Sequence, residues 1–410
     1  MERLYECFCS SRGVVTDSRK IIGGEMFFAL KGDNFDGNLY AAKALEAGAA
    51  CAVVDNPEVA VDGRYVVVPD TLEALQGLAR HHRSKLSTVV LAITGTNGKT
   101  TTKELCAAVL SRKLRTCYTQ GNLNNHIGVP LTLLSIPRDA ELAIVEMGAS
   151  AQGEIALLAS IAQPDYGLIT NIGRAHLEGF GGVEGIRKGK GELYDYLLSS
   201  GGVAIYRSDD AVLAAMVAER KGLKSESYTE QLGRGVRSNL VGGYNLYNVA
   251  AALAVGEIFG VGKQDALDAV ASYIPSNNRS QSQQTSRNML TVDCYNANPS
   301  SMAVAIASHE AAHYADYPHK VLILGDMLEL GEWSREEHAR VLTEALGSDA
   351  ERIFVVGECF AKTEVEDGRI VRFADAESLR QWLAENRLQG CFVLIKGSRG
   401  VGLERVLGEL

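Results

Sequence analysis

One short segment limits the fold of this chain more than any other. Residues 89–94 form an uninterrupted apolar run, a glycine-containing loop follows at 95–98, and residues 100–111 have helical spacing. An apolar run that ends at a glycine turn is typical of a strand buried on both faces of a parallel sheet. The segment therefore predicts a strand, a tight turn and a helix in direct succession.

The loop has the composition of a phosphate-binding turn. Gly95 and Gly98 allow the backbone to turn sharply and point N–H groups at one anion, and the following helix adds the positive end of its dipole. Lys99 supplies a charge for the β- and γ-phosphates, and the Thr100 hydroxyl is placed to bind Mg²⁺. The usual pattern begins with a glycine where this chain has Ile93, so only a shorter form is present. We expect ATP to be bound by Gly95, Thr96, Asn97, Gly98, Lys99, Thr100 and Thr101.

A second candidate metal ligand ends another apolar run. Glu146 follows residues 142–145, which read as a buried strand. A carboxylate at the carboxyl end of a parallel strand faces the ligand crevice of an α/β sheet. We therefore expect Thr100 and Glu146 to hold one Mg²⁺ together.

The length of 410 residues indicates several domains, and the pattern along the chain indicates three. Strand-like and helix-like stretches alternate, which favours an α/β fold with mainly parallel sheets. We predict a small N-terminal α/β domain at 1–85, a central ATPase domain at 86–276, and a Rossmann-like C-terminal domain at 277–410. The strands expected in the last two are 89–94, 142–146, 166–170, 203–206, 289–292, 320–324, 352–356 and 391–395.

Composition excludes some partners. The net charge is −9, from 41 basic and 50 acidic residues, so an interaction with nucleic acid is not expected. No apolar run reaches the roughly 18 residues of a membrane span, and the first residues do not read as a signal peptide. We expect a cytoplasmic monomer whose eight cysteines are reduced and mostly buried.

Further motifs accompany the loop in a fixed order, and together they resemble the Mur ligase family from Asp17 to Arg399. They are the segments 119–130, 146–149, 153–155, 170–178, 190–192, 295–299, 324–331 and 396–399. The resemblance implies a UDP-substrate domain, an ATPase domain and a C-terminal domain that brings the amine. It also implies a peptidoglycan ligase that adds D-alanyl-D-alanine to UDP-N-acetylmuramoyl-tripeptide through an acyl-phosphate. A sister ligase adding another amino acid, or a catalytically silent nucleotide-binding scaffold, stays open, as does lysine or diaminopimelate as third residue of the tripeptide.

The resemblance also implies a second Mg²⁺, held by His176 and a carbamylated Lys190. Lys188 competes with Lys190 by position, and the Gly-Glu that follows favours Lys190. Lys99, Lys190, His176 and Arg279, which approaches the γ-phosphate, are the catalytic candidates. Asn245 and Asn248 match the adenine contacts and Asp293 matches the ribose-binding acid.

Substrate contacts are expected on all three domains. Ser18 and Arg19 match the UDP-binding pattern. The amides of Asn122, Asn124 and Asn125 suit a sugar or peptide. The expected contacts on the amine side are Asn296, Asn298, Lys396 and Arg399.

Overall fold

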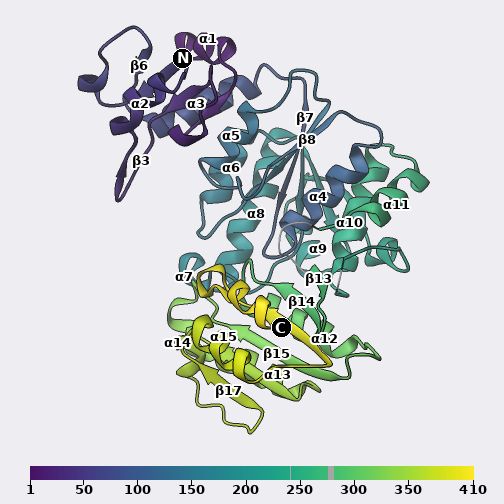
Figure 1. Cartoon of the computed structure of the whole chain (residues 1–410). Helices are drawn as coiled ribbons and strands as arrows, with labels where there is room; N and C mark the ends of the chain where they lie inside the picture. Colours follow the sequence, from purple (N-terminus) through teal and green to yellow (C-terminus); the bar gives the residue numbers. More distant parts are fainter. Residues whose placement is uncertain (241, 276–280) are drawn as a thin grey trace.

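The computed structural model describes residues 1–240, 242–275 and 281–410. The chain forms three α/β units in a row, purple, blue to teal, and green to yellow in Figure 1. The predicted fold class is confirmed. One main sheet lies in each predicted domain, and the first also holds the two-stranded hairpin β3-β4. The domain boundaries themselves stay a prediction.

The N-terminal unit is built on four parallel strands in the order β1-β2-β5-β6. Its elements are α1 (Glu2–Ser10), β1 (Val14–Val15), η1 (Ser18–Lys20), β2 (Met26–Phe28), β3 (Lys31–Gly32), β4 (Phe35–Asp36), η2 (Gly37–Tyr40), α2 (Ala41–Glu46), β5 (Cys51–Val54), η3 (Pro57–Val59), β6 (Tyr65–Val67) and α3 (Thr71–Arg83). Asp70 caps α3 by accepting from Glu73 N at 2.7 Å. The buried face of α3 packs on α5 and α6 of the next unit, and Arg83 bonds to Asp165 there at 2.9 Å. This helix is the main joint between the first two units.

The central unit contains a six-stranded, fully parallel sheet in the order β12-β11-β10-β7-β9-β8. Its strands are β7 (Val89–Thr94), β8 (Thr116–Tyr118), β9 (Leu142–Glu146), β10 (Tyr166–Ile169), β11 (Val203–Arg207) and β12 (Lys224–Tyr228). Its helices are α4 (Lys99–Leu110), α5 (Gly128–Leu134), α6 (Glu154–Ala162), α7 (Leu177–Phe180), α8 (Val183–Ser200), α9 (Ala211–Ala218), η4 (Glu230–Gly233), α10 (Asn245–Ile258) and α11 (Lys263–Ser272).

The apolar run of β7 is continuous because both faces of the sheet are covered. Leu91 and Ile93 belong to the hydrophobic cluster that includes α4 and α10. Val90 and Ala92 belong to the opposite cluster, which includes α6 and α8. Successive side chains of a strand point to opposite faces, so a strand between two helical layers is apolar throughout.

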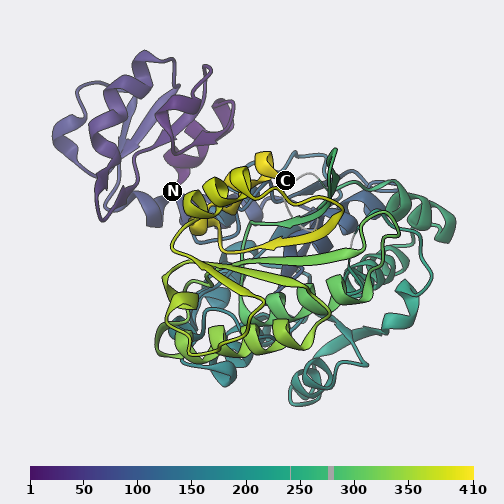
Figure 2. The same cartoon turned by 60° about the horizontal axis from the view of Figure 1, so that its bottom comes forward.

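The C-terminal unit has a second six-stranded sheet, in the order β13-β14-β18-β15-β16-β17, in which only β13 is antiparallel to its neighbour. Its elements are β13 (Gln281–Gln284), β14 (Met289–Asp293), α12 (Pro299–Ala311), β15 (His319–Gly325), η5 (Gly331–Trp333), α13 (Ser334–Gly347), β16 (Arg352–Val356), α14 (Glu358–Ala361), β17 (Ile370–Phe373), α15 (Ala376–Glu385), β18 (Cys391–Lys396), η6 (Arg399–Val401) and η7 (Leu403–Glu409). Figure 2 brings this unit forward and shows helices on both sides of its sheet.

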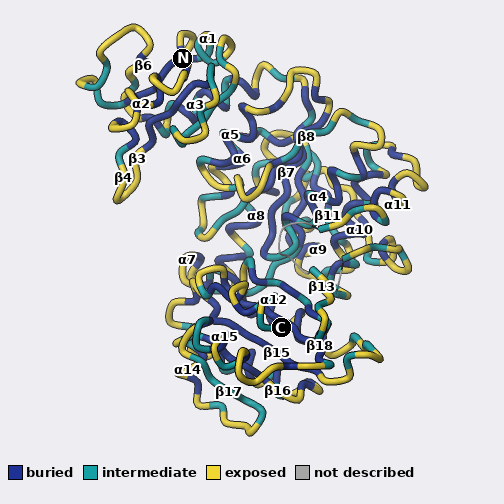
Figure 3. The backbone as a smooth tube through the Cα atoms, viewed as in Figure 1, coloured by how far each residue is buried: buried dark blue, intermediate teal, exposed yellow. Residues whose placement is uncertain are grey.

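Burial follows the sheets, whereas the hairpin β3-β4 is largely exposed (Figure 3). All eight cysteines are free, and four of them, Cys51, Cys106, Cys294 and Cys391, are buried. The expectation that most are buried is therefore only half met. Within the described residues, every helix is too short or too polar to cross a membrane.

Candidate functional site

A cleft of about 880 Å³ lies between the central and C-terminal units. Among the described residues, all those that line it follow residue 95, so the N-terminal unit makes no part of its wall. The central unit contributes the phosphate loop, the end of β9 and the loop after β10. The C-terminal unit contributes the carboxyl ends of β14 and β18, the start of α12 and Glu329. The cleft therefore joins the carboxyl ends of two parallel sheets, where α/β proteins bind ligands.

The phosphate loop has the predicted conformation. Gly95 and Gly98 have φ values of 139° and 78°, and α4 begins at Lys99. A Cβ at Gly95 would lie 2.0 Å from Thr170 Oγ1, and one at Gly98 would lie 2.4 Å from Asn248 Oδ1. Both positions therefore require glycine for backbone conformation and for space. Lys99 Nζ donates to the carbonyls of Gly95 and Thr96 at 2.9 and 3.0 Å.

The loop after β10 holds the phosphate loop in place. Asn97 N donates to Asn171 Oδ1 at 3.1 Å, and Thr170 Oγ1 donates to Asn97 O at 2.6 Å. Gly173 N donates to Thr96 Oγ1 at 2.9 Å. The loop after β10 therefore helps to fix the backbone of the phosphate loop, which does not depend on its own sequence alone.

Glu146 lies beside the phosphate loop, as predicted from its place at the end of β9. Its Oε1 accepts from Thr100 Oγ1 at 3.2 Å and from Asn124 Nδ2 at 2.7 Å. Its Oε2 is buried without a hydrogen bond, 3.6 Å from Lys103 Nζ. A buried hydroxyl beside an unsatisfied carboxylate oxygen is a donor set that fits Mg²⁺.

Lys103 was not predicted as a site residue. It is 1% exposed and lies one turn beyond Lys99 on α4. The sequence did contain an indication, because Lys103 shares a helix face with Cys106 and Leu110, both of which are buried.

Lys190 is buried, whereas its competitor Lys188 is exposed. Lys190 Nζ donates to Ala149 O at 3.1 Å and lies 5.1 Å from the centre of the Phe180 ring. Burial, and then the positive charge of Lys99, hold the pKa of Lys190 well below its ordinary value. The structure thus distinguishes two lysines that sequence reasoning could separate only by their neighbours.

His176 lies at the start of α7 and lines the cleft. Its Nδ1 pairs with Oε2 of Glu329, which belongs to the C-terminal unit. A hydrogen bond from His176 is the main cause that lowers the pKa of the Glu329 carboxyl. Lys190 contacts this region through the ring of Phe180, the last residue of α7.

The two predicted adenine contacts differ in placement. Asn248 lines the cleft, accepts from Thr102 Oγ1 at 3.1 Å and donates to Asn245 Oδ1 at 2.8 Å. Asn245 is buried and does not reach the lining. Two unpredicted side chains border the cleft nearby, with the Arg207 guanidinium 4.0 Å from the centre of the Tyr247 ring. Arg207 ends strand β11, so the rule that identified Glu146 applies to it as well.

The asparagines after β8 line the cleft, but two of them have internal partners. Asn124 donates to Glu146, as described above. Asn125 Oδ1 accepts from Ile127 N and Gly128 N at 3.2 and 2.8 Å. Asn122 also borders the cleft.

On the C-terminal side, Lys396 forms an ion pair with Asp293 at 2.5 Å and donates to Asn296 O at 3.1 Å. Asn298 Oδ1 caps α12 by accepting from Ser301 N at 2.9 Å, and its Nδ2 donates to Asn97 Oδ1 at 2.8 Å. The predicted site residues Asp293, Asn296, Asn298 and Lys396 all line the cleft.

Arg399 is exposed outside the lining, 5.8 Å from the centre of the Tyr295 ring. Ser18 and Arg19 lie on the N-terminal unit, away from the cleft wall. Arg19 pairs with Asp17 at 2.9 Å, and this hydrogen bond lowers the pKa of Asp17 to about 2. Arg279 lies outside the described residues.

Comparison with known domain families identifies the chain. Residues 11–83 match "Mur ligase family, catalytic domain", 93–256 match "Mur ligase middle domain", and 278–399 match "Mur ligase, glutamate ligase domain". The chain belongs to the Mur ligase family. This Mur ligase is 36% identical over 426 residues to the UDP-N-acetylmuramoyl-tripeptide–D-alanyl-D-alanine ligase of Bacillus subtilis (strain 168), covering 97% of this chain and 93% of that one.

Solved structures agree over the full length. The MurF structure from Acinetobacter baumannii has a TM-score of 0.89 at 30% identity and covers 100% of this chain and 98% of that chain. The MurF ligase from Thermotoga maritima in complex with ADP has a TM-score of 0.84 at 28% identity, with coverage of 100% and 98%. The three-unit fold of this Mur ligase is thus the fold of those ligases.

Proposed function

We propose that this Mur ligase uses ATP to add D-alanyl-D-alanine to UDP-N-acetylmuramoyl-tripeptide, forming UDP-N-acetylmuramoyl-pentapeptide. The observation that carries the proposal is the cleft in which the phosphate loop faces the polar end of the C-terminal sheet. The Bacillus subtilis relative bears the name of this activity, and the similarity spans almost the whole chain. The complex of the Thermotoga maritima relative with ADP supports ATP as the nucleotide.

The chemistry requires that two anions approach each other. The tripeptide carboxylate attacks the γ-phosphorus of ATP, ADP leaves, and the resulting acyl-phosphate is attacked by the amine of D-alanyl-D-alanine, which loses a proton as inorganic phosphate departs. Residues 95–101 hold the phosphates through backbone N–H groups and the charge of Lys99. Placing the reacting groups together in one cleft removes much of the entropic barrier to each step.

Thr100 and Glu146 fit the first Mg²⁺, since Glu146 Oε2 is buried and accepts no hydrogen bond. We propose His176 and Lys190 for a second. The lowered pKa of Lys190 favours the neutral amine, the form that reacts with CO₂ to give a carbamate with oxygen ligands. When bound by these residues, Mg²⁺ would supply positive charge to offset the repulsion between the triphosphate and the carboxylate.

We propose further nucleotide contacts outside the phosphate loop. Some rest on the cleft lining and others only on the family resemblance. Asn248, Arg207 and Tyr247 all line the cleft, and we propose that these three surround the base. We propose that Asn245 acts by holding Asn248, to which it is bonded. Asp293 for the ribose and Arg279 for the γ-phosphate stay predictions from the resemblance.

The C-terminal unit provides the amine side. We propose that Lys396, fixed by Asp293, attracts the dipeptide carboxylate, with Asn296 beside it. The amide groups of Asn124 and Asn298 already donate to Glu146 and Asn97. We therefore propose that both residues position these partners instead of binding substrate. Asn122 and Asn125 on the tripeptide side, and Arg399 near the dipeptide, remain proposed contacts.

Ser18 and Arg19 stand on a separate unit from the cleft, and we propose that they bind the UDP end of the long substrate. The substrate then extends from the first unit to the phosphate loop, and closure of the units brings its carboxyl end to ATP.

A substrate panel tests the proposed function. Phosphate release is measured with ATP, Mg²⁺ and UDP-N-acetylmuramoyl-tripeptide containing lysine or diaminopimelate, and with D-alanyl-D-alanine, D-glutamate or diaminopimelate as the amine. We expect turnover that depends on D-alanyl-D-alanine. Turnover with another amine indicates a sister ligase, and binding of ATP without turnover on any pair indicates a nucleotide-binding scaffold.

Two further properties follow from the same proposal. We propose a monomer as the working unit, which sedimentation tests. ATP, a UDP-linked precursor and eight free cysteines all suit a reducing compartment, so we propose the cytoplasm.

A further inference from the structure

The pair of His176 and Glu329 crosses the boundary between two units. His176 belongs to the central unit and Glu329 to the loop after β15 in the C-terminal unit. The Glu329 side chain is 62% exposed, and such ion pairs add little to stability. The contact therefore affects the orientation of the imidazole ring more than the stability of the fold.

Both partners have an unusual backbone. His176 and Glu329 have φ values of 51° and 63°, and within the described residues the only other non-glycine residue with positive φ is Gln163. Side chains disfavour this region, so residues remain there when their surroundings hold them. Here two such residues contact each other. This indicates that the backbone is held in a defined conformation on each side of the boundary.

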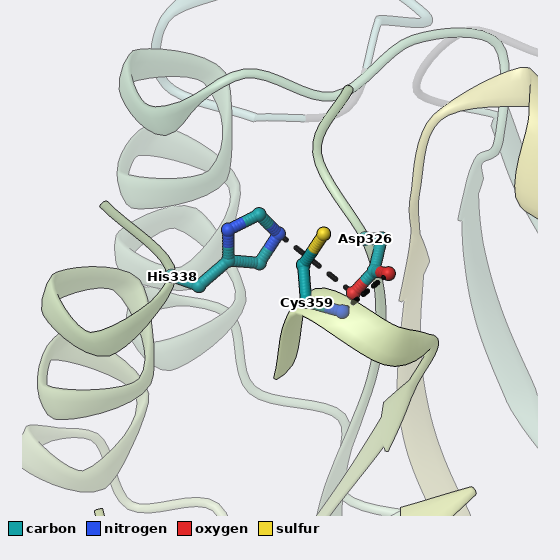
Figure 4. Close-up of side chains that lie close together, drawn as sticks. All are labelled: Asp326, His338 and Cys359. Carbon is teal, nitrogen blue, oxygen red and sulfur yellow. Dashed lines mark hydrogen bonds and ion pairs between the residues drawn. The ribbon is translucent and has the colours of Figure 1, made fainter. Parts of the chain in front are cut away.

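The Glu329 loop is held by a cluster of Asp326, His338 and Cys359, shown in Figure 4. Asp326 accepts from the backbone N–H groups of Cys359 and Phe360 at 2.8 and 2.9 Å. His338 Nε2 accepts from Met327 N at 3.0 Å. These acceptors are already used, so a metal ion at the cluster would have to displace backbone hydrogen bonds. The cluster instead holds the loop at Met327, two residues before Glu329.

The segment around His176 is held by the same unit. Arg174 Nε pairs with Glu337 of α13 at 2.9 Å, next to His338 in the sequence. Leu177 and Phe180 of α7 are buried in a cluster with Met327 and Leu330. Phe180 also covers Lys190, so the C-terminal unit packs on the helix that lies between the two proposed ligands of the second metal.

We propose that Glu329 is a positioning residue that orients His176 for metal binding, so that docking of the C-terminal unit completes the second metal site. This inference rests on the second metal site proposed above. His176 Nδ1 is in ion-pair contact with the Glu329 carboxylate. A carboxylate next to Nδ1 favours the tautomer that carries its proton there and offers Nε2 to a metal, and it raises the basicity of that nitrogen. Here the carboxylate comes from the unit that brings the amine, which links metal affinity to its arrival.

Mn²⁺ binding in the presence of ADP tests the inference without any turnover. Free Mn²⁺ is measured by electron paramagnetic resonance for the full chain and for Glu329→Gln, which keeps the size but removes the charge. We expect Glu329→Gln to weaken the second Mn²⁺ by about 10- to 100-fold while leaving the first unchanged. Glu332→Gln is the matched control, because Glu332 is exposed three residues further along the chain, in η5, and the charge change is identical. It should leave both affinities unchanged.

The outcomes separate the two proposals. If the unaltered chain binds two Mn²⁺ and Glu329→Gln binds both equally well, the role of Glu329 is wrong and the metal site stands. If the unaltered chain binds only one Mn²⁺, the second metal site is wrong and the inference falls with it. A folding defect in Glu329→Gln is recognised by weakening of the first site, and Arg174→Gln then provides the second variant, expected to weaken the second Mn²⁺ alone.

Discussion

Asn298 joins the start of α12 to the turn of the phosphate loop, because its Nδ2 donates to Asn97 Oδ1 at 2.8 Å while its Oδ1 caps the helix. The residue that begins a helix in the amine-side unit thus also contacts the backbone turn that is proposed to hold ATP. The Ser300 hydroxyl adds a second link by accepting from Arg174 N at 2.7 Å.

The two functions of Asn298 can be separated by substitution. Asn298→Ser keeps a good helix cap but is too short to reach Asn97, so unfolding free energy should change by less than about 0.5 kcal/mol. Asn298→Ala loses the cap as well and should lose about 1 kcal/mol. Both should lower kcat/KM by roughly tenfold, the equivalent of one hydrogen bond. Full activity in Asn298→Ser would show that the contact with Asn97 has no part in catalysis.

Lys103 should stabilise the metal-free state by compensating Glu146. Removing one partner of a buried ion pair leaves the other charge uncompensated, and Lys103→Met should lower the unfolding free energy by about 3 kcal/mol. With Mg²⁺ and ADP bound, the loss should be smaller, because the metal then compensates Glu146. Urea unfolding with and without Mg²⁺–ADP measures both values.

The matched background for this test is Glu146→Gln, which removes the charge that Lys103 faces. Lys103→Met should cost much less in that background, since the two effects are coupled. Equal losses in both backgrounds and in both ligand states would contradict the assigned pairing.

Lys190 should make stability depend on pH in a defined direction. The pKa of Lys190 is lowered in the folded chain, whereas the unfolded chain has the ordinary value of 10.5. Between these two pKa values the unfolded state binds more protons, so stability rises with pH across that window. In buffer free of CO₂, Lys190→Met should remove this rise and should be more stable than the unaltered chain at neutral pH.

Lys188→Met is the control for Lys190, since it removes the same charge from an exposed position of the same helix. Its unfolding curves should follow those of the unaltered chain at every pH. With labelled bicarbonate, a carbamate signal should persist in Lys188→Met and disappear in Lys190→Met. A pH slope that survives in Lys190→Met would contradict the burial of a neutral amine.

The parts of this site that could be predicted from the sequence are those that depend on neighbours along the chain. The strand 89–94 was predicted to the residue, because burial on both faces leaves a continuous apolar run. The loop and Glu146 followed from the rule that ligands bind at the carboxyl ends of parallel strands. Strand β12 was missed, since four of its five residues are exposed at the sheet edge and carry no apolar pattern.

Contacts between distant segments could not be predicted. Asn298 meets Asn97 across 201 residues, and Glu329 meets His176 from another unit. Nothing in local spacing reports such pairs, because they depend on how two sheets dock. Lys188 and Lys190 lie two residues apart and so face different sides of α8, and only tertiary burial shows which side is covered.

We propose that ATP phosphorylates the carboxyl end of the UDP-linked tripeptide in this cleft. This proposal is tested most directly with tripeptide whose terminal carboxylate carries a heavy oxygen isotope, by mass analysis of the phosphate released on addition of D-alanyl-D-alanine. One labelled oxygen should pass into each inorganic phosphate, and Lys99→Ala should abolish the transfer. Phosphate released without the label would contradict the proposal.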